Sequence, residues 1–453
     1  MNVLIYGLGL SGRAAARLLL DRGVTVLAVD DKAVDAGDLA EQVELLPGGG
    51  AIELPEGVEL VVVSPGVPLD RPVLESARRR GVPVIAEVEL AFPLLNGPVV
   101  AITGSNGKST TTAMAGEMIR AAGMPVEVCG NIGEPLSDKV EGPAGRVFVV
   151  EMSSFQIEGI VTFKPKAAAY LNLSEDHLDR YGSLEAYGAA KSRLFRDQDA
   201  DGIAVLNSDD PATTRTETRA RKRFFSRIGK VADGCYVAED GRVIEVGPTG
   251  EETELFHASE VPLAGVQNVE NAMAAALLAR AVGVEPAAIR AALVGFTGLP
   301  HRLQKVGERD GVVWYDDSKG TNPAATMKSI EGFADGTVHL ILGGRNKGAD
   351  LSLLEPVVRK KARRVYLIGE SAPDFEKALG NAVPYECSET MDRAVRAAAG
   401  NARSGEVVVL SPACASFDQF RNFGHRGQVF QELVRATVLE KIKGGPNGQE
   451  AGL

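Results

Sequence analysis

The sequence has little cysteine, no long apolar run and no excess of positive charge, and each shortage excludes a class of protein. Only four of the 453 residues are cysteines, scattered without a CxxC pair. A disulfide framework or a cysteine zinc site is therefore not expected, which favours a reducing cytoplasm. No uninterrupted apolar stretch reaches the roughly 18 residues of a membrane span. The opening residues, MNVLIYGLG, are typical of a strand and turn rather than a signal peptide, so we expect a cytoplasmic protein.

Acidic residues outnumber basic ones, with 60 Asp and Glu against 49 Lys and Arg and a formal net charge of -11. A nucleic-acid partner is not expected, because binding its backbone needs a basic surface. A small nucleotide is not excluded, since backbone amides and single lysines can bind one. The length exceeds the roughly 100–200 residues of one domain, and 45% hydrophobic residues exclude wholesale disorder. Two or three domains are expected.

A repeating order of short Val/Ile/Leu strand, Gly- or Asp-containing loop and Ala-rich helix runs along the chain. This order is typical of parallel strands that helices bury on both faces. The expected strands span residues 3–6, 25–29, 60–63, 99–103, 147–151, 167–171, 203–206, 312–315, 338–342, 364–368 and 407–410. Residues 223–263 differ, with short polar segments that predict a small antiparallel region. Ligands bind beyond the carboxyl ends of strands in such sheets, so the loops there are the candidate sites.

The first of these loops is GLGLSG at residues 7–12, with Asp30 at the end of the next strand. The pattern fits a dinucleotide fingerprint, in which glycines allow the turn and the acid binds a ribose hydroxyl. By itself it is compatible with an NAD-dependent oxidoreductase. Any diphosphate held at a helix N-terminus needs the same geometry, however. A different diphosphate ligand and a turn without a ligand both stay open.

A second loop, TGSNGKST at residues 103–110, lies between a predicted strand and a predicted helix. Its backbone amides and Lys108 can hold phosphates, and the hydroxyl after the lysine can bind Mg²⁺. Ile102 stands where the longer standard pattern has its first glycine, so the loop is a shortened form. It predicts an ATP site.

Other loops carry residues that are ambiguous one by one. Glu151 and Asp176-His177 suit a divalent ion, although His177 alone is equally compatible with an ordinary loop histidine. Lys191, judged by residue type, is a solvated helix residue, because an ammonium group repels Mg²⁺. Cys414 is expected to be buried and inert. The late strand-end loops offer cations and hydroxyls for an anionic co-substrate or for the nucleotide: Arg302, Asp317, Lys319, Thr321, Lys347 and Ser416.

Together and in this order, the motifs resemble those of the Mur ligases, the ATP-dependent amide-forming enzymes of peptidoglycan precursor synthesis. The resemblance rests on GLGLSG, TGSNGKST, EMSSFQ, NLSEDHLDRY with AAKSRLF, and GVQNVENAMAA. TGLPHR, YDDSKGTNP and SPACASFDQFRNFGHRG are similar to those of the family's D-glutamate-adding members. The resemblance implies an α/β protein of three domains. These are a Rossmann-like domain at 1–94 for a UDP-linked substrate, a central P-loop ATPase-type domain with a mostly parallel sheet at 95–298, and a Rossmann-like domain at 299–453 for the incoming amino acid.

The activity that the resemblance implies is joining D-glutamate to UDP-N-acetylmuramoyl-L-alanine through an acyl phosphate. ATP, two Mg²⁺ ions and a lysine carbamylated by CO₂ are the implied cofactors, and a monomer without a nucleic-acid or membrane partner is the implied state. The alternatives are another Mur ligase or a folylpolyglutamate synthetase-like ligase, and then an NAD-dependent oxidoreductase. A non-catalytic nucleotide-binding protein is a further alternative.

The resemblance also implies a role for individual residues. The catalytic residues are Lys108, His177 and Lys191. The ATP site comprises Gly104, Ser105, Asn106, Gly107, Lys108, Ser109, Thr110, Asn268, Asn271, Arg302, Asp317 and Lys319. The metal ligands are Ser109, Glu151, His177 and Lys191, whose carbamate would replace a repelling ammonium by an anionic oxygen ligand. The UDP-substrate residues are Leu10, Ser11, Asp31, Lys32, Ser64, Pro65, Gly66 and Asn131. The D-glutamate residues are Thr321, Lys347, Ser416 and Phe423.

Overall fold

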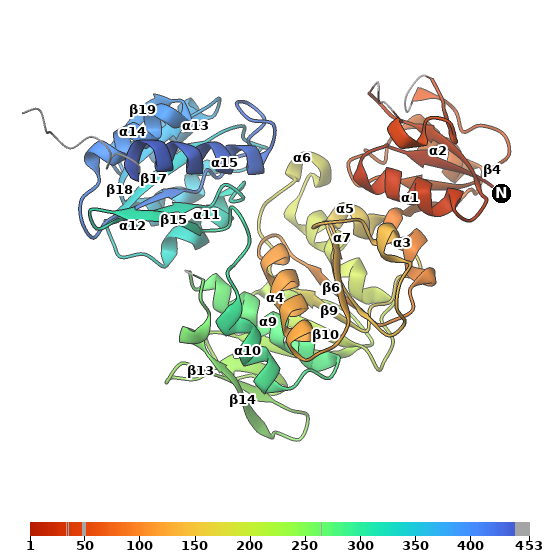
Figure 1. Cartoon of the computed structure of the whole chain (residues 1–453), viewed down its shortest axis with the longest axis horizontal. Coiled ribbons are helices and arrows are strands. Elements are labelled where there is room, and N and C mark those ends of the chain that lie inside the picture. Colours follow the sequence, from red (N-terminus) through yellow and green to blue (C-terminus); the bar gives the residue numbers. More distant parts are fainter. Residues whose placement is uncertain (33, 35, 48–50, 264, 440–453) are drawn as a thin grey trace, which may run out of the picture. The chain divides into compact units, whose positions relative to one another are not determined.

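The computed structural model describes residues 1–32, 34, 36–47, 51–263 and 265–439. Strands and helices alternate along them (Figure 1), which confirms the predicted α/β fold with mostly parallel sheets. The chain forms two compact units. The first consists of Met1–Leu173, Arg180–Val261 and Val269–Phe296, and the second of Ser174–Asp179, Pro262–Asn268 and the described residues from Thr297 onward. The domain limits at 94/95 and 298/299 stay a prediction.

The first sheet has five parallel strands in the order β3-β2-β1-β4-β5. Its strands are β1 (Asn2–Tyr6), β2 (Thr25–Val29), β3 (Val43–Leu45), β4 (Val58–Val63) and β5 (Val84–Ala86). Its helices are α1 (Leu10–Leu20) and α2 (Pro72–Arg79). Alternate strand residues such as Leu4 and Ile5 belong to two separate buried apolar clusters. The strand order reverses between β1 and β4, so a ligand crevice is expected at their carboxyl ends.

The second sheet has nine strands in the order β14-β13-β12-β11-β10-β9-β6-β8-β7. They are β6 (Val99–Thr103), β7 (Val126–Gly130), β8 (Val147–Glu151), β9 (Ala167–Tyr170), β10 (Ile203–Asn207), β11 (Arg221–Ser226), β12 (Gly234–Val237), β13 (Arg242–Val246) and β14 (Glu252–His257). The antiparallel region predicted for 223–263 is right only from β12 onward. β11 pairs in parallel with both β10 and β12, whereas β12, β13 and β14 pair antiparallel.

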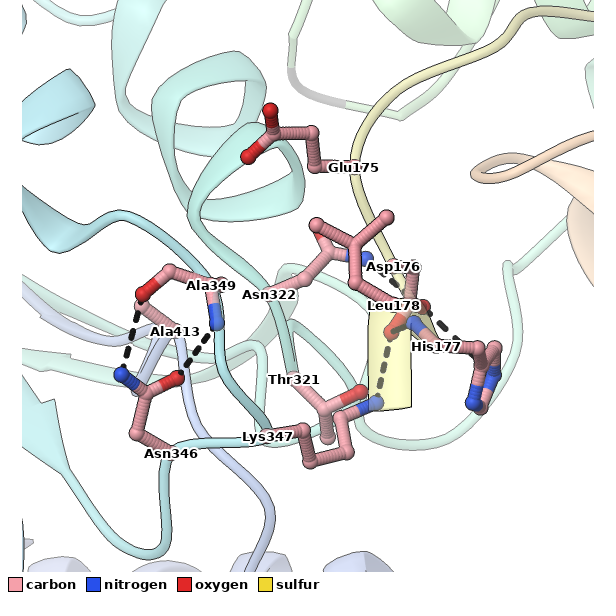
Figure 2. Close-up of a pocket in the computed structure, with 10 residues that line it drawn as sticks. All are labelled: Glu175, Asp176, His177, Leu178, Thr321, Asn322, Asn346, Lys347, Ala349 and Ala413. Carbon is pink, nitrogen blue, oxygen red and sulfur yellow. Dashed lines mark hydrogen bonds and ion pairs between the residues drawn. The ribbon is translucent and has the colours of Figure 1, made fainter. Parts of the chain in front are cut away.

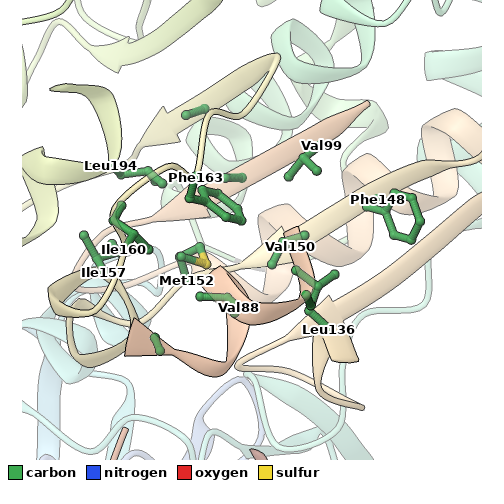
Figure 3. Packing of buried hydrophobic residues seen from close by; sticks show 14 of the residues in the cluster. Val88, Val99, Leu136, Phe148, Val150, Met152, Ile157, Ile160, Phe163 and Leu194 are labelled. Atoms are coloured by element: carbon green, nitrogen blue, oxygen red, sulfur yellow. The ribbon is translucent and has the colours of Figure 1, made fainter. Parts of the chain in front are cut away.

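Eight helices accompany this sheet and the segment before it. They are α3 (Glu87–Ala91), α4 (Lys108–Ala121), α5 (Ser154–Glu158), α6 (Leu178–Tyr181), α7 (Leu184–Arg196), α8 (Pro211–Thr214), α9 (Gln267–Ala281) and α10 (Pro286–Gly295). Figure 3 shows the apolar cluster around β6 and β8, where Val99, Phe148, Val150 and Met152 are almost fully buried. Because cores of this kind are close-packed, the ends of these two strands are held in fixed positions.

The third sheet has six strands in the order β15-β16-β20-β17-β18-β19. They are β15 (Gln304–Arg309), β16 (Val312–Asp316), β17 (Val338–Gly343), β18 (Ala362–Ile368), β19 (Tyr385–Glu389) and β20 (Val407–Leu410). Only the β15–β16 pair is antiparallel among these described strands. The helices are α11 (Pro323–Glu331), α12 (Glu355–Lys361), α13 (Ala372–Leu379), α14 (Met391–Asn401) and α15 (Phe423–Val434).

The predicted strands agree closely with the structure. Those at 25–29, 99–103, 147–151 and 407–410 have the observed bounds, and the other seven differ by at most two residues at an end. Continuous Val/Ile/Leu runs mark them because both faces of these strands are buried. In the described part of the chain, no helix combines the length and the apolar character that crossing a membrane requires.

Candidate active site

The loop between β6 and α4 has the geometry of a phosphate-binding loop. It turns through Gly104 (φ 150°) and Gly107 (φ 84°), and α4 begins at Lys108. A Cβ atom on Gly107 would lie 2.3 Å from Oδ1 of Asn271. Glycine is therefore required at 107 for both conformation and space. The loop presents the N-terminus of a 14-residue helix at the strand end, which is where phosphates bind.

Lys108 and Asn172 hold this loop in shape. The Lys108 Nζ donates to the carbonyl oxygens of Gly104 (2.8 Å) and Ser105 (2.9 Å). The Asn172 carbonyl accepts from the Ser105 amide at 3.0 Å, and its side chain makes two hydrogen bonds with the Asn106 backbone. Asn172 was not predicted as a site residue, because nothing in its local sequence shows that it reaches the neighbouring strand's loop.

Glu151 ends β8 beside the loop and is 2% exposed. Its Oε1 accepts a hydrogen bond from Nδ2 of Asn131 at 2.7 Å. Among the described residues, its Oε2 has no hydrogen-bond partner. A buried carboxylate oxygen in that state is unfavourable unless something else binds it. Glu151 therefore fits the predicted metal role, and Asn131 holds the carboxylate in place.

A complete metal centre is not preformed in the described ranges, where no three His, Cys, Asp or Glu side chains gather to hold an ion. This is compatible with Mg²⁺, which binds through one or two carboxylates and takes its other ligands from substrate phosphates and water. The donor set around Glu151 thus suits an ion that arrives with a nucleotide.

Lys191 is buried on α7, with 1% of the residue exposed. Its Nζ donates to the carbonyl oxygen of Gly104 at 2.9 Å and lies 4.3 Å from the centroid of the Tyr187 ring. The interpretation of Lys191 as a solvated helix residue, drawn from residue type alone, is therefore wrong. The structure brings Lys191 to the phosphate-binding loop, and its role as a carbamylated metal ligand stays a prediction.

Helix α9 carries both asparagines predicted near the nucleotide. Asn268 and Asn271 are one turn apart and are 7% and 6% exposed. The Thr111 hydroxyl, from the first turn of α4, donates to Oδ1 of Asn271 at 3.3 Å. Asn271 thereby contacts the helix that follows the loop.

In the second unit, Ser174–Asp179 lies against loops that follow β16, β17 and β20, and a small pocket forms there (Figure 2). Its lining residues are Glu175, Asp176, His177, Leu178, Thr321, Asn322, Asn346, Lys347, Ala349 and Ala413. The structure thus brings together His177, Thr321 and Lys347, three of the predicted site residues.

Asp176 is the polar centre of this pocket. It accepts from Nζ of Lys347 at 2.8 Å, from Nδ2 of Asn322 at 3.2 Å and from the backbone amide of His177 at 3.0 Å. Burial by itself would raise the pKa of Asp176, but the charges of Lys347 and His177 and the two side-chain hydrogen bonds bring it below its ordinary value. Asp176 therefore stays ionised and fixes the Lys347 ammonium at the pocket.

Asp317, Lys319 and Ser416 lie in the same strand-end loops, whereas Arg302 precedes β15 and Phe423 is the first residue of α15. Asp317 is 6% exposed and accepts from the hydroxyls of Ser411 and Ser329, both at 2.7 Å. Burial raises the pKa of Asp317 to about 6. Lys319 Nζ lies 3.9 Å from the centroid of the Phe423 ring, so two residues assigned to different ligands are neighbours. Ser416 is buried in the loop after β20.

Three loops meet at the carboxyl ends of β1, β2 and β4 in the first sheet. The Ser64 hydroxyl donates to the Gly7 carbonyl at 2.6 Å, and Asp30 accepts from the amides of Leu8 (2.9 Å) and Lys32 (3.0 Å). Asp30 therefore ties two loops together. Leu10 begins α1 and is 76% exposed. The predicted UDP-substrate residues of this sheet thus belong to loops that converge.

Three family models match the chain in succession. They are the Mur ligase MurD-like N-terminal domain over residues 1–86, the Mur ligase middle domain over 102–279, and the Mur ligase glutamate ligase domain over 301–414. A protein of Acidobacterium capsulatum named UDP-N-acetylmuramoylalanine–D-glutamate ligase is 44% identical, over 96% of each chain. One of Solibacter usitatus with the same name is 42% identical, over 96% of this chain and 97% of its own.

The chain belongs to the Mur ligase family. MurF of Acinetobacter baumannii has a TM-score of 0.62 at 18% identity and covers 96% of this chain and 93% of its own. MurC of Thermotoga maritima, a UDP-N-acetylmuramate–alanine ligase, has a TM-score of 0.59 at 18% identity and covers 96% and 99%. At these identities the solved structures show a shared fold.

In this Mur ligase, Arg426 is a buried residue of α15 that was not predicted to matter. Its side chain donates to the hydroxyl (2.9 Å) and carbonyl (2.7 Å) of Ser318 and to the carbonyl of Cys414 (3.0 Å). Burial lowers the pKa of Arg426 to about 10. Arg426 thus joins the loops that carry Lys319 and Ser416. The motif RNFGHRG contains it, but only the fold shows which loops it reaches.

Proposed function

We propose that this chain is an ATP-dependent ligase that adds D-glutamate to UDP-N-acetylmuramoyl-L-alanine in peptidoglycan precursor synthesis. The observation that carries the proposal is its likeness, along almost its whole length, to proteins named for that reaction. The match of residues 1–86 to a MurD-like model supports a UDP-linked substrate rather than NAD at GLGLSG.

The phosphate-binding loop and Lys108 are assigned to ATP. The loop's backbone and the start of α4 favour bound phosphate oxygens, and the Lys108 ammonium offsets charge on the terminal phosphates. Ser109 and Thr110 follow at the helix start, and Asn268 and Asn271 would lie near the adenine. Arg302, Asp317 and Lys319 complete the proposed ATP set.

Glu151 and Ser109 would hold one Mg²⁺, and His177 with a carbamylated Lys191 the second. The ions supply neutralisation of phosphate charge. The burial of Lys191 and its contact with the loop support this role, since a carbamate is an anionic oxygen ligand. Carbamylation first needs the lysine ammonium to lose one proton; the neutral Nζ then bonds to the carbon of CO₂ and releases a second proton.

Lys347, Thr321, Ser416 and Phe423 are assigned to D-glutamate. Two carboxylates require cations and hydroxyls around them, and Lys347 is fixed by Asp176 at the pocket described above. Leu10, Ser11, Asp31, Lys32, Ser64 to Gly66 and Asn131 are assigned to the UDP-linked substrate.

The chemistry follows from the poor reactivity of a carboxylate. Transfer of the terminal phosphoryl group of ATP to the L-alanyl carboxylate yields ADP and an acyl phosphate, whose leaving group is phosphate. The amine of D-glutamate then attacks the carbonyl carbon, the bond to phosphate breaks, and the amine loses a proton. Lys108 would stabilise charge in the first step, and His177 would stabilise the oxyanion of the second.

The test is phosphate release from ATP with UDP-N-acetylmuramoyl-L-alanine and either D-glutamate, L-glutamate or no amino acid. We expect release that needs both the nucleotide substrate and D-glutamate. Release with another amino acid would leave the assignment to the Mur ligases intact but would contradict the proposed specificity for D-glutamate. No release despite tight ATP binding would favour a nucleotide-binding protein.

We also propose a cytoplasmic monomer, because ATP and UDP-linked precursors are cytoplasmic metabolites and each proposed ligand has residues within this one chain. Size-exclusion chromatography with light scattering tests the monomer. A stable dimer at micromolar concentration would contradict it.

A further inference from the structure

Arg180, the third residue of α6, connects two parts of the first unit. Its Nη1 donates to the backbone carbonyls of Val67 at 3.2 Å and Pro65 at 3.4 Å. Its Nη2 donates to Oε2 of Glu158, the last residue of α5. The guanidinium carbon lies over the ring of Phe155 on the same helix, 4.3 Å from the ring centroid. One side chain therefore contacts both a loop of the first sheet and a helix that accompanies the second.

The loop that Arg180 contacts follows β4 and is assigned above to the UDP-linked substrate. Residues 64–67 form a turn, closed by a hydrogen bond from the Val67 amide to the Ser64 carbonyl at 3.0 Å. The Ser64 hydroxyl holds this turn to the carbonyl of Gly7, the first residue of GLGLSG. Arg180 holds the same turn from outside the sheet, through two of its carbonyls. The position of the turn thus depends on both contacts.

Helix α5 is a fixed partner for the other end of this contact. It begins three residues after Glu151, the carboxylate proposed to bind Mg²⁺. A capping box holds its first turn, in which the side chains of Ser153 and Gln156 each accept from the other's backbone amide. Just after its last residue, the Gly159 carbonyl accepts from the amide of Ala86 at 2.9 Å. Helix α5 thus connects the guanidinium to the strand end that carries the proposed metal ligand.

The ion pair between Arg180 and Glu158 is largely shielded from water, since their side chains are 19% and 11% exposed. A guanidinium suits this place because its planar fork donates from separate nitrogens, one toward the carboxylate and one toward the carbonyls. A lysine has a single nitrogen, so we expect it to keep the ion pair at the expense of the carbonyl contacts. The pairing and the hold on the turn can therefore be separated by substitution.

Resting on the UDP-linked substrate proposed above, we infer that Arg180 is a positioning residue for the phosphoryl-transfer step. The substrate has to extend from the loops of the first sheet to ATP at the loop between β6 and α4. Its carboxylate oxygen can attack the terminal phosphorus only within a narrow range of distances and angles. By holding the turn at 64–67 in one place relative to α5, Arg180 sets where that carboxylate arrives. It acts through the turn and not by contact with the reacting atoms.

The test compares two variants of the full-length protein, Arg180→Met and the double variant Arg180→Met/Glu158→Gln. The single change leaves the Glu158 carboxylate without its cation and should lower the thermal midpoint. The double variant removes that unpaired charge, so its midpoint should return most of the way to that of the parent. We expect kcat to fall roughly 10- to 100-fold in both, because both release the turn. Turnover is measured well below the lowest midpoint, so that unfolding does not enter.

The Michaelis constants and two further variants sharpen the comparison. The KM values for ATP and D-glutamate should stay within about threefold of the parent's, and the KM for UDP-N-acetylmuramoyl-L-alanine should rise by less than kcat falls. Arg180→Lys should regain the midpoint but only part of kcat. The control is Arg79→Met on α2, which removes an equal charge from an arginine that is 65% exposed and pairs with Glu53. It should keep the parent's kcat.

Three results would overturn the inference. If the double variant regains kcat together with its midpoint, Arg180 only stabilises the fold, and the ligase stands. If Arg180→Met raises the KM for UDP-N-acetylmuramoyl-L-alanine at an unchanged kcat, the turn contributes to binding alone, and the ligase again stands. If the parent forms no product from ATP, UDP-N-acetylmuramoyl-L-alanine and D-glutamate, the proposed function fails and the inference fails with it.

Discussion

The Nζ atom of Lys191 donates to the carbonyl oxygen of Gly104, the same oxygen that accepts from Lys108. One backbone carbonyl of the phosphate-binding loop therefore connects two lysines from helices α4 and α7. Because Lys191 is buried, its state of charge acts directly on the loop. The proposed carbamylation would exchange a hydrogen-bond donor for an anion at this point, which links modification of Lys191 to nucleotide binding.

Lys191→Met should lower turnover by roughly 100-fold or more, because it removes the atom that carries the proposed carbamate. Methionine replaces most of the aliphatic part of the lysine side chain, although the contact of Nζ with the Tyr187 ring is lost. Formate or acetate should restore part of the activity, and removal of CO₂ should lower the activity of the parent protein. Phosphate release measures all three effects.

The matched control is Arg196→Met, also on α7 but half-exposed and paired with Asp197. It should leave turnover unchanged. Full activity of Lys191→Met, or no response of the parent to CO₂, would show that Lys191 has no carbamate role.

Glu151→Gln should raise the Mg²⁺ concentration needed for half-maximal activity by roughly tenfold or more. The amide oxygen can still accept from Asn131, so the local packing stays while the charge is lost. Nucleotide binding without Mg²⁺ should be unchanged. A Mg²⁺ titration identical to that of the parent would remove Glu151 from the metal site.

Lys347→Met should destabilise the second unit by about 1–3 kcal/mol, because it leaves the Asp176 carboxylate buried without its cation. The depressed pKa of Asp176 means that its stabilising effect is present above its ordinary pKa near 4 and is lost as the pH falls through the lower folded value. The variant should therefore lose the part of the acid transition that Asp176 causes. Unfolding midpoints between pH 2 and pH 7 measure it, and an unchanged acid transition would contradict the pairing. The variant should also raise the KM for D-glutamate.

Glu87→Gln should stabilise the protein at pH 8 and have little effect at pH 4. Glu87 is 2% exposed, and burial raises its pKa to about 7 although the Ser137 backbone and side chain act in the opposite direction. The folded state thus holds the proton more tightly, so the contribution of Glu87 is full below about pH 4 and is lost as the pH rises through 7.

We expect a gain of about 1–3 kcal/mol at pH 8, measured by urea unfolding. Glu141→Gln is the control, since Glu141 is 88% exposed and should change stability little at either pH. If Glu87→Gln is less stable than the parent at both pH values, the ionised Glu87 carboxylate does not destabilise the folded state and the prediction is contradicted.

Most strands were predictable because parallel strands buried on both faces carry unbroken Val/Ile/Leu runs, as at 147–151. The parallel strand β11 was not predictable, because its first residues are Arg221, Lys222 and Arg223. Three consecutive charged residues are typical of a surface loop. In the structure Asp233 and Glu245 form ion pairs with the two arginines, which allows these residues to belong to a strand.

The candidate site was predictable where chemistry is local in sequence, as in the loop at 103–110. Asn172 and Arg426 were not predicted although they lie in the motifs NLSEDHLDRY and RNFGHRG, because each acts on a loop far away in sequence and only the fold shows which loop that is. The burial of Lys191 was not predictable from its local sequence either. Its residue type predicts exposure, and only the family resemblance gave Lys191 a role in the site, that of a carbamylated metal ligand.

The most direct test of the central claim is the mass of the nucleotide product formed from UDP-N-acetylmuramoyl-L-alanine, ATP and Mg²⁺ with D- and L-glutamate supplied separately. With D-glutamate we expect a product heavier by one glutamyl residue, formed in equal amount to the phosphate released, and with L-glutamate no such product. An unchanged nucleotide substrate with both isomers, while the protein binds ATP normally, would contradict it.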